Sequence, residues 1–254
     1  MALPRPPKFG ERRMMLRRQL STETLPEASG EFKPTPTISA PRLIYIFNHV
    51  TFKNDLHEPR VGSEKDVQAL RKTFEKLQCQ IIEIKDPTLA AVKEKISEIE
   101  RKNFEQQSAL IIVLLSHGGE NEMIVASDNK EYSLHKDVLL PLFKNETLKG
   151  KPKILIAQAC KGELEADATL MKHSPNEYVK CFSSTEGFKS YRRRSKGSLY
   201  IQTLCKCMDE LATEKDFLSI MDEVNLKVDK DSSAEGYRQL PCYTKAISKK
   251  YYFR

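Results

Sequence analysis

Two continuous apolar runs stand out in the middle of the chain, and each is followed by a residue with reactive chemistry. The first spans 109–115 and leads into Ser116-His117-Gly118; the second spans 154–157 and leads into Gln158-Ala159-Cys160. Short runs that are apolar at every position are typical of strands buried on both faces of a sheet. Because the C-terminal ends of parallel strands open into one crevice, we expect the histidine and the cysteine to meet there.

From residue 43 onward the polar and apolar positions alternate between strand and helix patterns. Further strands are expected at 43–47, 80–84 and 178–182, in a hairpin over 123–132, and within 243–252. Apolar residues at helical spacing predict helices at 63–77, 88–99, 134–142, about 198–211 and 216–228. Ser63 and Asp66 have the spacing of a capping box, which predicts Ser63 as the N-cap of the first helix. The alternation predicts an α/β fold, a mostly parallel sheet with helices on both faces.

The first 40 residues differ from the rest of the chain. Prolines punctuate them, apolar residues are sparse and basic residues are frequent, so we expect a disordered basic leader over 1–40. Overall, 39% of residues are hydrophobic and 30% are charged, which suits a soluble globular protein. No apolar run approaches the roughly 20 residues that cross a bilayer, so no membrane association is expected.

The cysteines and the net charge narrow the function class further. Six cysteines occur without a C-x-x-C pair or a secretory signal, which favours free thiols in the reducing cytoplasm. Cys205 and Cys207 are expected to pack in the core, and the remaining histidines lack ligand spacing, so no metal site is predicted. The net charge of +7 raises the possibility of nucleic-acid binding, but the chain contains no recognisable binding motif.

A cysteine and a histidine at the same edge of a sheet suggest nucleophilic catalysis by the thiol. A free thiol has a pKa near 8.5, so at neutral pH little of it is thiolate without a neighbouring base. His117 is predicted to accept the proton of Cys160 and later to protonate the leaving amine. The backbone N–H groups of Gly118 and Cys160 are suited to stabilise the oxyanion of the tetrahedral intermediate.

The pentapeptide Gln158-Ala159-Cys160-Lys161-Gly162 resembles the caspase signature Q-A-C-[RQG]-G, in which the histidine lies about 50 residues upstream. Lys161 departs from the signature but keeps the charge of arginine. Further stretches resemble the same family, and the likeness extends from about 43 to 254, so that only the leader lies outside it. Within the family, the chain resembles short-leader insect caspases. These stretches include Arg60-Val61-Gly62-Ser63, Gly150-Lys151-Pro152-Lys153, Gly197-Ser198-Leu199-Tyr200-Ile201-Gln202 and Leu240-Pro241-Cys242.

The resemblance implies a single caspase-like domain with a six-stranded, mainly parallel sheet. It also implies a cysteine endopeptidase of programmed cell death that cuts after aspartate through a thioester, without metal or cofactor. Arg60 and Arg192 fall at the two positions whose arginines bind the aspartate carboxylate, assisted by Gln158 and Ser116. An arginine fork recognises a carboxylate bidentately, so this role fits the residue type.

The outer part of the substrate site departs from the usual family pattern. Lys189 and Tyr191 stand where aromatic residues commonly wall the second pocket, and Arg193 stands where the outer pocket begins. We therefore expect a shift toward acidic residues upstream of the cut.

The resemblance further implies a precursor divided into a large-subunit region, 41–167, and a small-subunit region, 168–254. The linker at about 163–176 contains Asp167 after Leu-Glu-Ala, which is the best candidate for processing. Dimerisation is expected through the last strand, giving a heterotetramer after processing. The expected partners are aspartate-containing protein substrates, a second copy of the chain, and other caspases or caspase inhibitors.

One alternative stays open at the level of the sequence. A caspase-like protein with weak catalysis could modulate another caspase. The presence of Cys160, His117, Arg60 and Arg192 argues against this alternative, since a modulator does not need the complete set.

Overall fold

The computed structural model describes residues 40–159, 177–186 and 188–254, and all described elements lie in the unit Ile38–Arg254. Within those ranges, six strands form one sheet in the order β10-β7-β6-β3-β1-β2. All neighbouring strands are parallel except β7 and β10, which are antiparallel. The strands are β1 (Arg42–Asn48), β2 (Cys79–Lys85), β3 (Leu110–Leu115), β6 (Lys153–Gln158), β7 (Tyr178–Phe182) and β10 (Cys242–Ala246). The predicted α/β class and mainly parallel sheet are confirmed.

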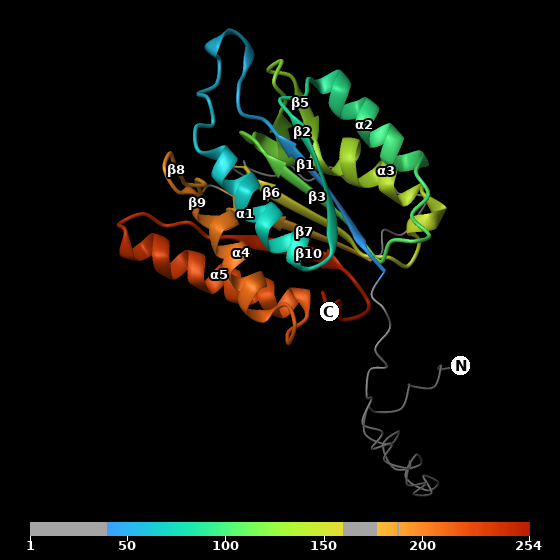
Figure 1. The fold of residues 1–254 in the computed structure, drawn as a ribbon. Helices are drawn as coiled ribbons and strands as arrows, with labels where there is room; N and C mark the ends of the chain where they lie inside the picture. Colours follow the sequence, from blue (N-terminus) through green and yellow to red (C-terminus); the bar gives the residue numbers. More distant parts are fainter. Residues whose placement is uncertain (1–39, 160–176, 187) are drawn as a thin grey trace, which may run out of the picture. The chain divides into compact units, whose positions relative to one another are not determined.

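Helices cover both faces of this sheet (Figure 1). One face carries α1 (Ser63–Lys76), α4 (Leu199–Leu211) and α5 (Phe217–Ala234). The opposite face carries α2 (Leu89–Arg101) and α3 (Leu140–Phe143), and a π-helical segment, Leu134–Leu139, leads into α3. Short 3-10 helices occupy Lys53–Asp55, Glu120–Glu122 and Glu146–Leu148.

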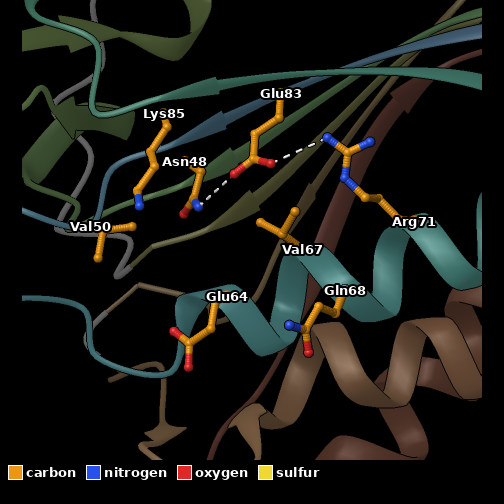
Figure 2. Close-up of a pocket in the computed structure, with 8 residues that line it drawn as sticks. All are labelled: Asn48, Val50, Glu64, Val67, Gln68, Arg71, Glu83 and Lys85. Atoms are coloured by element: carbon orange, nitrogen blue, oxygen red, sulfur yellow. Dashed lines mark hydrogen bonds and ion pairs between the residues drawn. The ribbon is translucent and has the colours of Figure 1, made fainter.

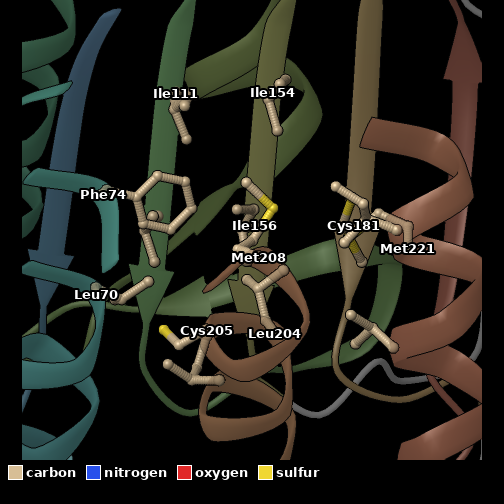
Figure 3. Packing of buried hydrophobic residues seen from close by; sticks show 14 of the residues in the cluster. Leu70, Phe74, Ile111, Ile154, Ile156, Cys181, Leu204, Cys205, Met208 and Met221 are labelled. Carbon is tan, nitrogen blue, oxygen red and sulfur yellow. The ribbon is translucent and has the colours of Figure 1, made fainter. Parts of the chain in front are cut away.

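The two faces are built from alternate residues of the same strands. In β3, Ile111 and Val113 belong to the cluster beneath α1, α4 and α5, whereas Leu110 and Ile112 belong to the cluster beneath α2 and α3. This alternation follows from the period of two in a strand, and it requires every strand position to be apolar. Figure 3 shows the first cluster, where Phe74 of α1 and Leu204 of α4 pack against the central strands. Cys205 and Cys207 of α4 are buried, as expected for core residues.

The capping-box prediction at the start of α1 is wrong. The N-cap is Gly62, at φ +93°, and it makes no side-chain cap hydrogen bond. Ser63 and Asp66 are fully buried and bond to other parts of the fold instead. Both side chains therefore form tertiary hydrogen bonds, to Asn48 and Ser198, and neither caps the helix.

Other differences concern element boundaries. The helix expected over 216–228 continues to Ala234, and the last strand is confined to Cys242–Ala246. The hairpin expected over 123–132 is present as β4 (Met123–Val125) and β5 (Glu131–Ser133). A second hairpin, β8 (Arg192–Arg193) with β9 (Gly197–Ser198), forms where a loop was expected.

The strand register brings the candidate residues to one edge. Asn48 pairs with Leu115, and Leu115 pairs with Gln158, so β1, β3 and β6 end level with one another. Cys160, Asp167, the linker 163–176 and the leader up to residue 39 lie outside the described residues. No helix within the described ranges is both long and apolar enough to cross a membrane.

Candidate active site

The segment that carries His117 is fixed to two neighbouring strands. The backbone N–H of Ser116 donates to the Gln158 carbonyl at 3.2 Å, which extends the β3–β6 pairing to the strand ends. The Ser116 hydroxyl donates to the Val125 carbonyl at 2.5 Å, and the Val125 N–H donates to the His117 carbonyl at 3.0 Å. The β4–β5 hairpin thus holds the histidine in place, and the Ser116 hydroxyl is engaged in that support.

The hydrogen bond of the His117 ring sets its tautomer. Its Nε2 lies 2.8 Å from the Glu58 carbonyl, which is an acceptor, so Nε2 carries the hydrogen and Nδ1 has the free lone pair. Burial lowers the pKa of His117, an effect that the nearby charge of Arg60 increases and the Glu58 carbonyl opposes. A neutral imidazole with a free nitrogen is the form that a general base requires.

Two aromatic side chains confine the same ring. The Phe52 ring centroid lies 5.0 Å from that of His117, and the His57 ring stacks on it at 5.4 Å with an interplanar angle of 22°. Sequence reasoning assigned no role to His57, because one histidine without ligand spacing carries no local signal. Its stacking adds a second histidine to the wall beside the candidate base.

The segment leading to Cys160 is anchored by serines that the sequence analysis did not select. The carbonyl of Ala159 accepts hydrogen bonds from the hydroxyls of Ser183, at 3.1 Å, and Ser190, at 3.2 Å. Ser183 directly follows β7, so it lies at the same strand-end edge as Gln158. This position was a usable signal, since active-site residues collect where parallel strands end.

Arg60 is the most informative side chain of the site, because it is 0% exposed. Its Nη1 donates to the His49 carbonyl at 3.1 Å and to the Ser63 hydroxyl at 2.7 Å. Its Nε and Nη2 are buried without a hydrogen-bond partner. Burial and the nearby Arg192 lower the pKa of Arg60 to about 9. A buried cation with two unpaired donors creates a strong demand for an anionic ligand.

Arg192 approaches from β8 and is half-buried. Its Nε donates to the Val61 carbonyl at 3.1 Å, and burial lowers its pKa. Gln158, at the end of β6, is buried and its Oε1 has no partner. Arg192 lies near enough to Arg60 for its charge to lower the pKa of Arg60.

The β8–β9 hairpin that carries Arg192 is tied to α1 through Asp66. This buried carboxylate accepts from the backbone N–H of Ser198 at 2.7 Å, from the Ser198 hydroxyl at 2.5 Å and from Gln202 at 2.9 Å. Gly197 packs so tightly here that an added Cβ would overlap Asp66 Oδ1. Asp66 thus positions the hairpin and supplies a negative charge near Arg60.

Tyr191 and Arg193, which were predicted to belong to the outer part of the substrate site, line one small cavity of about 110 Å³. The Tyr191 ring lies 3.9 Å, centroid to centroid, from that of Tyr237. Arg193 forms an ion pair with Glu235 at the end of α5. An acidic substrate side chain at this position must therefore compete with Glu235 for the guanidinium.

Comparison with known proteins agrees with this geometry, since residues 41–252 match the caspase domain. The chain belongs to the caspase family. It is 31% identical to caspase-3 of Felis catus over 235 residues, covering 83% of each chain. It is 28% identical to caspase-6 of Gallus gallus over 243 residues, covering 82% of this chain and 79% of the relative. The family resemblance is confirmed and places the chain among the cysteine peptidases, whereas the likeness to insect members stays a prediction.

The described residues contain no group of three or more histidine, cysteine, aspartate or glutamate side chains arranged to hold a metal ion.

Proposed function

We propose that this caspase-family chain is a cysteine endopeptidase that cleaves peptide bonds after aspartate. The observation that carries the proposal is Arg60, a fully buried guanidinium that leaves Nε and Nη2 without partners. A carboxylate would pair with both groups at once, and a neutral side chain would leave them unsatisfied. Substrates without the carboxylate should therefore be rejected strongly.

The proposed reaction uses Cys160 as nucleophile and His117 as base and acid. The free Nδ1 of His117 accepts the proton of the Cys160 thiol, and the sulfur attacks the scissile carbonyl carbon. The N–H groups of Gly118 and Cys160 stabilise the resulting oxyanion. The C–N bond then breaks as His117 protonates the amine, leaving a thioester. A water molecule, deprotonated by His117, hydrolyses the thioester and restores the thiol.

Substrate recognition in the proposal extends beyond the aspartate pocket. Arg60 and Arg192 bind the carboxylate, and Gln158 completes the pocket. Ser116, whose hydroxyl donates to the Val125 carbonyl, contributes to the pocket wall only. Tyr191 and Arg193 contribute to the outer site and favour acidic residues. A peptide library tests the outer site, and a preference for aliphatic residues at both outer positions would contradict it.

We also propose that the chain is a cytoplasmic precursor in programmed cell death. Processing at Asp167, within the linker 163–176, would separate a large-subunit region, 41–167, from a small-subunit region, 168–254. The edge position of β10 in the described sheet supports dimerisation through that strand. Other caspases or caspase inhibitors are the further proposed partners.

One experiment tests activity, specificity and processing together. The full chain and its Cys160→Ala variant are expressed, and the termini of all fragments are mapped. Cleavage after Asp167 in the intact chain, absent from the variant, is the expected result. The sample is also treated with an electrophile that carries an aspartate side chain. Absence of both self-cleavage and labelling in a folded dimer would favour the alternative, a caspase-like modulator.

A further inference from the structure

A continuous series of hydrogen bonds connects the buried Arg60 to the surface of the sheet. Arg60 Nη1 donates to the Ser63 hydroxyl at 2.7 Å, and that hydroxyl donates to Asn48 Oδ1, also at 2.7 Å. Asn48 Nδ2 donates to Glu83 Oε1 at 3.1 Å. Arg71 Nη2 lies 3.3 Å from Glu83 Oε2, in an ion pair. We call Ser63, Asn48, Glu83 and Arg71 the Arg60 support network.

From Arg60 to Glu83 each group donates to the next, and Arg71 donates to Glu83 from the opposite side. Ser63 accepts from Arg60, so its single hydrogen is available for Asn48. The acceptor oxygen of Asn48 then faces Ser63, and its amide hydrogens face the Glu83 carboxylate. Hydrogen bonds in such a series polarise one another, so the negative charge of Glu83 supports the positive charge of Arg60.

The outer half of the network lies beside a cavity of about 260 Å³ between α1 and the ends of β1 and β2. Figure 2 shows Glu83 bonded to both Asn48 and Arg71, with Gln68 on the α1 wall of the same cavity. The network therefore reaches from the proposed substrate pocket to solvent across α1 and the two outer strands.

We propose that Ser63 and Asn48, anchored by Glu83, are positioning residues that hold Arg60 ready for the substrate carboxylate. This inference rests on the proposed function. The network and the His49 carbonyl engage Nη1, so Nε and Nη2 remain the two groups available for a ligand. An unrestrained arginine loses rotamer entropy when it binds a ligand, and a guanidinium that is already fixed avoids much of that loss.

The test compares three variants with the intact enzyme: Ser63→Ala, Asn48→Leu and the double variant. Steady-state kinetics use a peptide with aspartate before the cut and its asparagine counterpart. For the aspartate peptide, we expect KM to rise about tenfold in each single variant, because a hydrogen bond to a charged group is lost. The kcat should change by less than about twofold, since the chemistry at Cys160 is not altered. The double variant should be no worse than Ser63→Ala, because Asn48 acts through Ser63.

Gln68→Ala is the matched control, because Gln68 lines the same cavity outside the network. It should keep the KM of the intact enzyme. Alkylation of Cys160 by iodoacetamide provides a readout that does not use the carboxylate pocket, and its rate should be unchanged in every variant. If Ser63→Ala fails to fold, Glu83→Gln keeps the shape of the network and should raise KM by about threefold.

The outcomes separate the two levels of the proposal. An intact enzyme that cleaves aspartate and asparagine peptides equally would refute the proposed function itself. An aspartate-specific enzyme whose network variants keep the original KM would overturn the positioning role alone. Parallel losses of kcat and of iodoacetamide alkylation would also overturn it, because they would show a general structural effect.

Discussion

His49 should make the fold sensitive to acid. Its side chain is 0% exposed, its Nε2 lies 3.0 Å from the Tyr132 hydroxyl, and its Nδ1 has no hydrogen-bond partner. Burial, and then the nearby charge of Arg60, lower its pKa from 6.5 to about 4. The folded protein therefore keeps this imidazole neutral in a pH range where the unfolded chain protonates it.

The size of the effect follows from these two pKa values. Above pH 6.5 neither state protonates His49, so its contribution to stability is fully present. As the pH falls below 6.5, the unfolded state gains a proton first, and the free energy of unfolding decreases by about 1.4 kcal/mol per pH unit. The loss ends near the folded pKa of about 4, where it totals about 3 kcal/mol.

The assay is urea denaturation in the Cys160→Ala background, at intervals between about pH 4 and pH 7. His49→Gln keeps a polar side chain beside Tyr132 but cannot titrate, so its unfolding free energy should fall less steeply. The difference between the two curves should be constant above pH 6.5 and change by about 3 kcal/mol toward the acid end. Tyr132→Phe retains the histidine and should keep the steep dependence. Equal pH slopes for His49→Gln and its parent would refute the reasoning.

Four further substitutions test the packing of the fold. Gly197 has φ +86°, and the Cβ of Gly197→Ala would press against Asp66, so this variant should displace the β8–β9 hairpin and abolish peptide cleavage. Gly150→Ala is the control, because Gly150 has φ +71° but open space around it. It should lower the free energy of unfolding by about 1 kcal/mol and leave the cleavage kinetics unchanged. Asp66→Ala leaves three donors unpaired and should lower the free energy of unfolding by about 3 kcal/mol in a thermal melt. Lys180→Met removes the buried ion pair with Glu122 and should lower the free energy of unfolding by about 2 kcal/mol in the same melt, so an unchanged value would contradict the prediction.

The sheet could be predicted from the sequence because short runs that are apolar at every position are typical of strands buried on both faces. Runs such as 110–115 are apolar at every position, and the structure buries both faces of that strand. The strand ends then followed from topology, which places His117 and Gln158 at one edge without knowledge of any side-chain contact. The family resemblance added Arg60 and Arg192, which no pattern of polarity distinguishes from surface arginines.

The errors share one physical cause, which is that a polar residue can satisfy either a local or a distant partner. Ser63 and Asp66 had the spacing of a capping box, yet their side chains bond to Asn48 and Ser198. The β8–β9 hairpin was missed for a similar reason. It spans few residues, and Asp66 on a distant helix holds it in place.

Among the buried charged side chains that the structure describes, Arg60 stands apart because two of its donors have no partner. Asp66 is buried and bonded to Ser198 and Gln202, whereas Arg60 is buried with two donors unpaired. A fold under selection for stability alone would remove such a deficit, because each unpaired buried donor costs about 1–3 kcal/mol. Its presence beside Arg192, which lowers the pKa of Arg60 further, supports the proposal that Arg60 binds a substrate carboxylate. Sequence can propose Arg60 by resemblance; the unpaired donors give the physical reason for it.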